Sequence, residues 1–391
     1  MRTPSTHTPL LQNKKRMLGR GLNRYDERQQ IWSISNDLRC SAGASPSRFL
    51  VYRIAFRLEF AYMQYRNLGS SGLLVSPVCL GTMTFGTPVA ESDAIRLTQA
   101  AMDLGINFID TANVYEGYAR YLGSSGGVAE EIVGKALVGR RDKAIVATKV
   151  CAPVGPGPQD RGLSATHILR EVDRSLRRLQ TDYIDLYIIH WPDREVPPET
   201  TLAAIDQVVR AGKVRSFGIS NHSAWQMCEF LWLADRNGWP KAVSSQIPFS
   251  LLRREFQHDL DFCRKYGIGV TPYQALQSGL LTGKYRRGQP PPSDSRAAEK
   301  PDWIWKLDDS LFDKLERAES LAKELGVPMS QYALAWTLTQ PAITSPIVGV
   351  KRLDQIQDAV AATAVSIPTE HLKQLDAICP APWKQHDPIR G

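Results

Sequence analysis

Polar side chains follow a series of apolar runs in this sequence, at the point where each run ends. Three of these endings carry groups that can move protons: the carboxylate of Asp110, the amine of Lys149 and the imidazole of His190. The loop after Asp110 soon returns a phenol, that of Tyr115. A single polar residue after an apolar run would indicate only that a buried strand ends there. An acid, a base and an imidazole after consecutive runs indicate a site for proton transfer.

Three later apolar runs also end in side chains that can form hydrogen bonds or stack on a ring. These endings are Ser220 with Asn221, then Gln246, then Tyr273. If the runs are parallel strands of a barrel, their carboxyl ends meet on one face, which is where such folds place their active sites. We therefore expect the polar endings to line one pocket.

The elements that must position these residues are short β-branched runs alternating with longer segments of helical spacing. The helical spacing is clear at Ile168, Val172, Leu176 and Leu179, with Ser164 as the candidate N-cap. Such alternation predicts a parallel sheet, and eight βα units in about 300 residues match a closed (β/α)8 TIM barrel. The predicted strands span residues 78–81, 107–110, 144–149, 183–190, 214–220, 242–246, 269–273 and 345–349.

Two further features bear on the fold. No Gly-x-Gly-x-x-Gly motif opens a helix after the first strand, which weighs against a doubly wound dinucleotide-binding sheet. Residues 65–69 and 73–76 flank Ser70-Ser71-Gly72, a pattern that predicts an amino-terminal β-hairpin. We expect this hairpin to close the floor of the barrel.

The positive charge of the chain is concentrated at its amino terminus. Residues 1–62 carry eleven Lys and Arg against four acidic residues, whereas residues 63–391 carry 37 basic and 36 acidic residues. The predicted barrel domain, residues 63–391, is therefore nearly neutral, which argues against a nucleic-acid partner. We expect residues 1–62 to be a basic extension that is disordered or dispensable. Three interpretations stay open: a mis-set start upstream of Met63, a targeting or membrane-attracted arm, and a segment that packs on the barrel.

The cysteines and histidines suggest neither disulfides nor a metal site. Six cysteines are scattered without a Cys-x-x-Cys pair, which favours a reducing, cytoplasmic location. No apolar run approaches the roughly 20 residues of a membrane span. His167, His222, His258 and His371 lack metal-ligand spacing, so we predict no metal and expect these side chains at the surface or in helix caps. The oligomeric state is not indicated.

Several motifs, in the right order, give the sequence a family resemblance from about Met63 to the end. The motifs are Phe108-Ile109-Asp110-Thr111-Ala112 with Tyr115, Thr148-Lys149, Ile189-His190-Trp191-Pro192, Gly218-Ile219-Ser220-Asn221 and Gly279-Leu280-Leu281-Thr282-Gly283-Lys284-Tyr285. This set resembles the aldo-keto reductase superfamily. The resemblance implies an NADP-dependent oxidoreductase that reduces aldehydes or ketones, with a catalytic tetrad of Asp110, Tyr115, Lys149 and His190.

The implied reaction explains these residue types. Hydride arriving at a carbonyl carbon leaves negative charge on the oxygen, so an acid must deliver a proton there. Tyr115 is that acid by resemblance, but a free phenol has a pKa near ~10, about 4 kcal/mol from neutrality. A cation at ~4 Å in an effective dielectric of about 20 supplies that order of energy. Lys149 is the expected cation, held by Asp110, while His190 orients the carbonyl oxygen.

The same resemblance implies the residues that bind NADPH. Ser220, Asn221 and Gln246 would hold the nicotinamide carboxamide, and Tyr273 would stack on its ring. The implied contacts to the phosphates come from the loop residues Leu276, Gly279 and Lys284 and from Gly349, Lys351, Arg352 and Gln355 at a loop-to-helix junction. Lys351 and Arg352 favour the 2′-phosphate of NADPH over NADH. Alternatively, they are two solvated cations at a helix start.

The sequence departs from the family pattern at three positions, and two alternative functions stay open. Glu116 stands where the family commonly has Gly, Phe249 where Tyr is common, and Ala359 where Asn is usual near the adenine.

One alternative function is that of a non-catalytic nicotinamide-binding sensor or partner subunit with the same barrel. The other is a serine hydrolase at Ser125, in a Gly-x-Ser-x-Gly match that lacks a preceding strand.

The small-molecule carbonyl substrate itself is not identified by the sequence. Specificity in this family sits in long loops, here residues 150–162 and 286–307, which are rich in Pro and Gly. Trp303 and Trp305 in the second loop suggest an apolar or ring-bearing guest.

Overall fold

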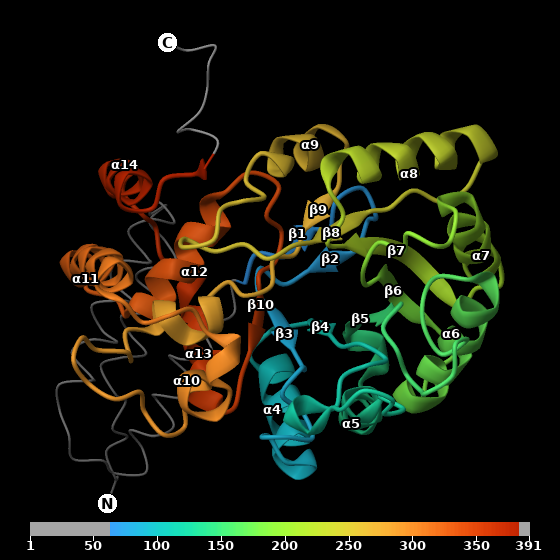
Figure 1. Ribbon diagram of the computed structural model, residues 1–391, viewed down its shortest axis with the longest axis horizontal. Helices are drawn as coiled ribbons and strands as arrows, with labels where there is room; N and C mark the ends of the chain where they lie inside the picture. The colour runs from blue at the N-terminus through green and yellow to red at the C-terminus, as the bar shows by residue number, and fades with distance from the viewer. Residues whose placement is uncertain (1–62, 383–391) are drawn as a thin grey trace, which may run out of the picture. The chain divides into compact units, whose positions relative to one another are not determined.

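A single sheet of eight parallel strands forms the centre of the protein (Figure 1). The computed structural model describes residues 63–382, so the predicted extension over residues 1–62 lies outside the described part. Strands β3 to β9 pair in chain order, and β10 lies beside β3. These strands are β3 (Cys79–Gly81), β4 (Phe108–Asp110), β5 (Ile145–Val150), β6 (Ile184–Ile189), β7 (Val214–Ser220), β8 (Ser244–Gln246), β9 (Gly269–Val270) and β10 (Ile347–Gly349).

Hydrogen bonds between the last two strand segments close the sheet on itself. The N–H of Thr344 donates to the carbonyl of Val270 at 2.8 Å, and that of Ile347 donates to Pro272 at 2.8 Å. The order of strands and this closure confirm the predicted (β/α)8 barrel.

Helices follow the strands and form the outer layer of the barrel (Figure 1). In α6 the Ser164 hydroxyl accepts a hydrogen bond from the N–H of His167, as the N-cap prediction requires, and Ile168 and Val172 are buried. No helix within residues 63–382 is long and apolar enough to cross a bilayer. The α-helices are α4 (Glu91–Asp103), α5 (Val128–Ala136), α6 (Ala165–Leu179), α7 (Pro198–Arg210), α8 (Ala224–Asn237), α9 (Asp259–Lys265), α10 (Arg296–Glu299), α11 (Asp309–Glu324), α12 (Met329–Thr339), α13 (Leu353–Ala362) and α14 (Thr369–Ile378).

Several strands are shorter than the sequence predicts, and in two of them the missing part contains a proline. The expected strand at 269–273 is regular only over Gly269–Val270, and the one at 345–349 only over Ile347–Gly349. Each expected strand contains a proline, Pro272 or Pro346, which has no N–H to donate to a neighbouring strand. Pairing resumes at Tyr273, whose N–H donates to the carbonyl of Ile247 at 2.9 Å.

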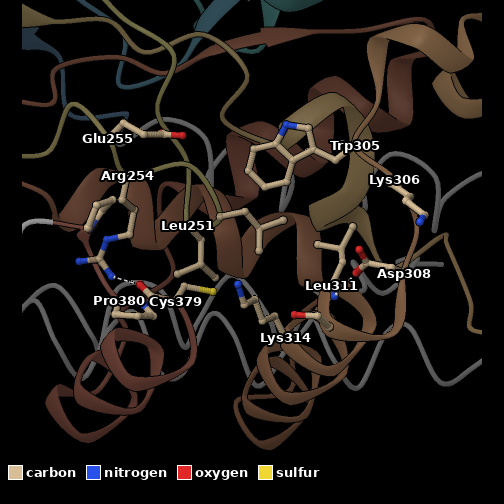
Figure 2. A pocket seen from close by; sticks show the side chains of 13 residues that line it. Leu251, Arg254, Glu255, Trp305, Lys306, Asp308, Leu311, Lys314, Cys379 and Pro380 are labelled. Atoms are coloured by element: carbon tan, nitrogen blue, oxygen red, sulfur yellow. Dashed lines mark hydrogen bonds between the residues drawn. The ribbon is translucent and has the colours of Figure 1, made fainter. Parts of the chain in front are cut away.

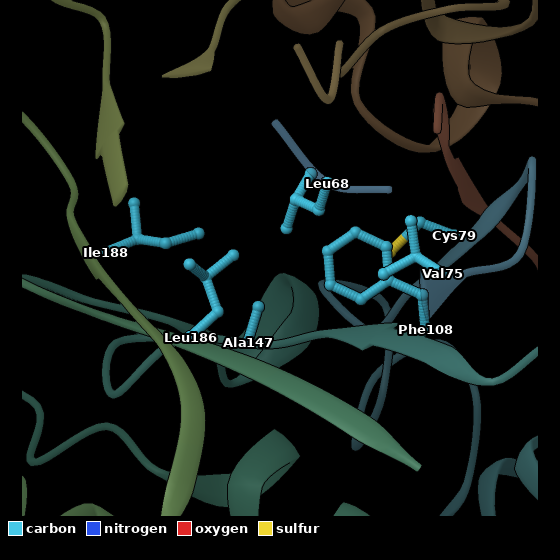
Figure 3. Close-up of a cluster of buried hydrophobic side chains, with 7 residues drawn as sticks. All are labelled: Leu68, Val75, Cys79, Phe108, Ala147, Leu186 and Ile188. Atoms are coloured by element: carbon cyan, nitrogen blue, oxygen red, sulfur yellow. The ribbon is translucent and has the colours of Figure 1, made fainter. Parts of the chain in front are cut away.

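The floor of the barrel is a buried apolar cluster (Figure 3). The hairpin of β1 (Arg66–Asn67) and β2 (Leu74–Val75) contributes Leu68 and Val75, both fully buried. The barrel strands contribute Cys79, Phe108, Ala147, Leu186 and Ile188. The predicted hairpin thus packs against the inward side chains of the barrel and fills its interior at this end.

Candidate active site

The alternation of side chains along each strand places the predicted catalytic residues one layer beyond this cluster. Successive residues of a strand point to opposite faces, so residues two apart share a face. Asp110 lies two residues after Phe108, Lys149 two after Ala147, and His190 two after Ile188. Each floor residue faces the barrel interior, and therefore each of these polar side chains enters the interior at the carboxyl end of its strand.

Lys149 is the centre of the resulting polar cluster. Its side chain is fully buried, and Nζ donates to Asp110 Oδ1 at 2.6 Å, to the Thr111 carbonyl at 2.8 Å and to the Tyr115 hydroxyl at 3.1 Å. The other carboxylate oxygen of Asp110 accepts from Gln246 Nε2 at 2.8 Å. Three fixed contacts orient the ammonium group, so that its charge lies directly against the phenol.

The pKa values of the cluster differ in one respect from the expectation. Burial acts to lower the pKa of Lys149, but the charges of Asp110 and Tyr115 outweigh it and raise that pKa. Burial raises the pKa of Tyr115 above its ordinary value, and Lys149 lowers it only in part while Asp110 adds to the rise. The expected net depression of the phenol pKa is therefore wrong, because burial and the charge of Asp110 together outweigh the charge of Lys149.

His190 is held mainly by stacking. Its ring lies on that of Trp191 with centroids 3.7 Å apart, and its edge faces the Tyr115 ring at 6.0 Å. Burial, then the charges of Lys149 and Arg120, hold the pKa of His190 well below its ordinary range. The buried Nδ1 has no hydrogen-bond partner among the described residues. The imidazole is thus neutral at physiological pH and can contribute a hydrogen bond without a charge.

A cavity of about 1340 Å³ opens at this end of the barrel. It is lined by Asp110, Tyr115 and His190, while Lys149 lies behind them. All eleven residues implied for the cofactor also line it: Ser220, Asn221, Gln246, Tyr273, Leu276, Gly279, Lys284, Gly349, Lys351, Arg352 and Gln355. The structure therefore brings both predicted sets of residues into one pocket.

Asn221 joins the proposed nicotinamide end of the pocket to the polar cluster. Its backbone is left-handed, with φ of 62°, a conformation that Asn adopts more readily than most side chains. The Tyr273 hydroxyl donates to Asn221 Oδ1 at 2.8 Å, and Asn221 Nδ2 donates to the His190 carbonyl and to Ser220 Oγ, each at 3.0 Å. The amide is thus fixed between strands β6 and β7 and the segment after β9.

Cations gather at the opposite end of the pocket. Burial lowers the pKa of Lys284, Asp294 opposes this effect, and Lys351, Arg352 and Arg296 lower the pKa further. A Cβ added to Gly279, which has φ of +90°, would lie 3.0 Å from Lys284 Nζ, so glycine leaves room beside this ammonium. Such a cradle of cations beside an uncrowded backbone fits the phosphates of a dinucleotide.

Two groups expected to face phosphate already have partners within the protein. Lys351 Nζ contacts Glu299 Oε2 at 2.5 Å, and Arg352 contacts Asp294 Oδ2 at 3.1 Å. The backbone N–H of Lys351 donates to Gln355 Oε1 at 2.7 Å, so Gln355 occupies part of the helix start that was expected to receive an anion. A bound phosphate would exchange with these partners or share the cations with them.

The comparisons with known proteins agree with this geometry. The model of the aldo/keto reductase family matches residues 77–380. The chain belongs to the aldo/keto reductase family. It is 39% identical to an uncharacterized oxidoreductase, YrpG, of Bacillus subtilis, over 82% of this chain and 97% of that protein. It is 35% identical to the versiconal hemiacetal acetate reductase of Aspergillus parasiticus, over 80% of this chain and 96% of that protein.

A third relative has a different description. The chain is 38% identical to a probable voltage-gated potassium channel subunit beta of Arabidopsis thaliana, over 78% of this chain and 92% of that protein. Family membership makes this aldo/keto reductase an oxidoreductase with a site for carbonyl chemistry, and the predicted family is confirmed.

The departures from the family pattern fall in different places. Glu116 lines the cavity beside Tyr115. Phe249 is fully buried and stacks on Trp336 with centroids 5.7 Å apart, so it belongs to the core of this aldo/keto reductase. Ala359 lines the cavity from α13, where its short side chain offers no hydrogen bond to a ligand.

The predicted surface or helix-cap position is wrong for two of the histidine side chains. His167 and His222 are buried rather than at the surface, and their Nδ1 atoms contact the carbonyls of Gln159 at 3.1 Å and Ser220 at 2.8 Å. Burial lowers the pKa of His222 to about 4. Within residues 63–382 no group of three or more His, Cys, Asp or Glu side chains could hold a metal ion.

The Gly-x-Ser-x-Gly match does not form a nucleophile elbow. Ser125 is exposed in a loop between a 3-10 turn at Gly117–Ala119 and helix α5, and no strand precedes it. An elbow requires a strand immediately before the nucleophile. The hydrolase alternative therefore has no structural support at this residue.

A second cavity has a volume of about 410 Å³, and Figure 2 shows the side chains that line it. Its walls come from residues 251–255, 305–314 and 379–382 and include none of the four predicted catalytic residues. The buried guanidinium of Arg254 already bonds to the Cys379 carbonyl at 2.6 Å and to Asp376 at 2.8 Å. This cavity offers no free buried polar group that would recognise a ligand.

Proposed function

We propose that this protein reduces the carbonyl group of an aldehyde or ketone to an alcohol, with NADPH as cofactor and Tyr115 as general acid. The observation that carries the proposal is the contact of 3.1 Å between Lys149 Nζ and the hydroxyl of Tyr115, a residue that lines the cavity. NADPH, when bound, would supply the hydride. The side chains of this protein have to orient the carbonyl, protonate its oxygen and exclude water.

The raised pKa of Tyr115 suits an acid of this kind. The phenol stays protonated at neutral pH, so the proton is present when the substrate arrives. An alkoxide oxygen is more basic than a phenolate, so proton transfer from Tyr115 to it is downhill. The ammonium of Lys149 then stabilises the phenolate that remains, and Asp110 keeps that ammonium in place.

His190 would act on the same oxygen as a neutral donor. Its depressed pKa keeps it uncharged, so it adds a hydrogen bond without competing for the proton. The stacking on Trp191 fixes its ring plane. The substrate oxygen would therefore lie between Tyr115 and His190, whose rings are 6.0 Å apart at their centroids.

The residues for the cofactor would act at two ends of the cavity. Ser220, Asn221, Gln246 and Tyr273 would bind the nicotinamide, and the cations beside Gly279 would bind the phosphates. The positive charge near Lys284, together with Lys351 and Arg352, supports NADPH rather than NADH. The free cysteines among the described residues are consistent with the cytoplasmic location that we propose.

Replacing Tyr115 with Phe tests the acid role. The variant should lower the rate of NADPH oxidation with an aldehyde by at least ~10²-fold, typical of losing a positioned acid, while NADPH binding is nearly unchanged. Tyr65→Phe is the matched control, because it removes a hydroxyl that donates to the Gly105 carbonyl at 3.0 Å outside the cavity. Near-normal turnover in Tyr115→Phe would remove this residue from the mechanism.

The second candidate function is that of a nicotinamide-binding sensor or partner subunit with slow chemistry. It is favoured by the relative described as a probable potassium channel subunit beta. This function predicts tight NADPH binding without turnover across a panel of aldehydes, quinones and ketosugars. Multiple turnovers on any member of the panel would favour the reductase.

A further inference from the structure

The side chain of Arg120 lines the cavity that holds the proposed catalytic residues. Arg120 follows the 3-10 turn at Gly117–Ala119, a few residues after Tyr115, and lines the same cavity as His190. Its charge is near enough to contribute to the depressed pKa of His190, after burial and Lys149. Arg120 therefore lies within electrostatic reach of the place where the carbonyl is proposed to react.

Neutral carbonyl groups hold this guanidinium in position. Arg120 Nη1 donates to the Val114 carbonyl at 3.1 Å and to Ser124 Oγ at 3.4 Å, and Nη2 donates to the Pro153 carbonyl at 2.7 Å. These contacts use three of the five N–H groups that an arginine carries. The side chain is thus fixed, with donor capacity left over.

No acidic side chain within residues 63–382 forms an ion pair with Arg120. Burial lowers the pKa of its guanidinium, and Glu116 opposes that effect only in part. Two cations further along the cavity differ from it, because Lys351 is paired with Glu299 and Arg352 with Asp294. A partly buried cation without an acid partner attracts an anionic group of a ligand.

We propose that the preferred substrates are carbonyl compounds that also carry a carboxylate, and that Arg120 binds this carboxylate. The inference rests on the proposed function and adds a substrate class to it. A planar carboxylate matches the fork of a guanidinium better than other anions of similar size. The indole of Trp191 stacks on His190 and also lines the cavity. Its flat apolar face would pack against a substrate ring that links the carbonyl group to the carboxylate.

A matched pair of aldehydes tests the proposal. 4-Carboxybenzaldehyde and methyl 4-formylbenzoate share the ring and the aldehyde but differ in charge. We expect the protein to have the higher kcat/KM for the carboxylate. Arg120→Gln should lower that kcat/KM by about 10- to 100-fold, the range for a charge-assisted hydrogen bond, and should change the value for the ester by less than about 3-fold.

Three further variants separate recognition from structural support. Arg120→Lys keeps the charge without the fork and should give a partial loss for the carboxylate. Glu116→Gln removes an opposing charge and should raise kcat/KM for the carboxylate only. Arg140→Gln is the charge control, since Arg140 pairs with Asp103 at 2.7 Å on the exposed surface, and both substrates should be unaffected.

Two kinetic outcomes would overturn the proposal. A preference of the wild-type protein for the ester would show that the cavity does not select carboxylates. Equal losses for both aldehydes in Arg120→Gln, with Arg120→Lys restoring both, would show that Arg120 only ties the loop at Val114 to the loop at Pro153.

A binding measurement distinguishes failure of this inference from failure of the proposed function. Calorimetry with NADP+ present compares 4-(hydroxymethyl)benzoate with neutral 4-methylbenzyl alcohol. Tight binding of the carboxylate, lost by about 10-fold or more in Arg120→Gln, would support the inference even if no aldehyde is reduced. Equal affinities for the two compounds would refute it even if aldehydes are turned over.

Discussion

Removing the buried ammonium of Lys149 should destabilise the protein as well as stop its chemistry. Lys149 is fully buried and Asp110 is 3% exposed, and their charged atoms are 2.6 Å apart. Lys149→Met keeps a long unbranched side chain but removes the charge. The carboxylate of Asp110 would then keep the donor of Gln246 and lose its counter-ion.

The size of the effect follows from this geometry. At 2.6 Å and an effective dielectric of about 20, the attraction is about 6 kcal/mol. Part of this is spent on desolvating both groups, so breaking a buried pair at one partner typically costs about 3–5 kcal/mol. We expect a loss of that size in the free energy of unfolding, a large share of the roughly 5–15 kcal/mol of a typical protein.

The assay is urea unfolding followed by circular dichroism, with NADPH oxidation measured on the same samples. Asp110→Asn combined with Lys149→Met removes both charges and should recover most of the lost stability while turnover stays at least ~10²-fold reduced. Lys213→Met is the matched control, because Lys213 and Asp173 are also 2.6 Å apart but are 39% and 44% exposed. That exposed pair should contribute less than about 1 kcal/mol.

Either of two results would refute the reasoning. One is a loss below about 1 kcal/mol in Lys149→Met, equal to that of the Lys213→Met control, which would mean that burial does not strengthen the ion pair. The other is a double variant as unstable as Lys149→Met alone. In that case the unpaired carboxylate of Asp110 would not be the cause of the instability.

The remaining predictions concern the cofactor, pH and the amino terminus. Lys351→Ala with Arg352→Ala should weaken NADPH binding much more than NADH binding, and equal losses would show that the pair does not bind the 2′-phosphate. Because the pKa of His222 is about 4 in the fold and near ~6.5 when unfolded, protonation of the unfolded chain should lower stability as pH falls below 6.5. At pH 5 this amounts to about 2 kcal/mol, seen as a shallower pH dependence of urea unfolding in His222→Gln. A chain beginning at Met63 should fold and keep the full-length rate, whereas an insoluble or inactive product would show that the extension is structural.

Much of the proposed site was predictable because the carboxyl ends of parallel strands meet on one face of a barrel. In the structure Phe108 and Ala147 lie on the inward face, and the same face two residues later carries Asp110 and Lys149. The placement of His190 beyond Ile188 follows the same rule. Sequence alone predicted that the three side chains end neighbouring strands, whereas the inward face came from the structure, because both faces of these strands are buried.

The sequence was also enough to identify the family, because several short motifs of that family occur together in the expected order. The exact lengths of β9 and β10 were less predictable, although the prolines at 272 and 346 were visible in the sequence. The misplacement of His167 and His222 has another cause. Their burial depends on helices and loops that pack over them, which no periodic pattern in the chain describes.

Only the tertiary structure decided which charges are paired and which are left over. Glu299 in helix α10 and Asp294 just before that helix contact Lys351 and Arg352, which lie more than 50 residues away in the sequence, and no motif indicates these pairs. Among the described residues Arg120 has no such partner and is held by carbonyl groups instead. The direction of the Tyr115 pKa likewise depends on how burial and two opposite charges balance in space. Sequence determines which groups are available, but long-range electrostatics depends on distances and burial that exist only once the chain has folded.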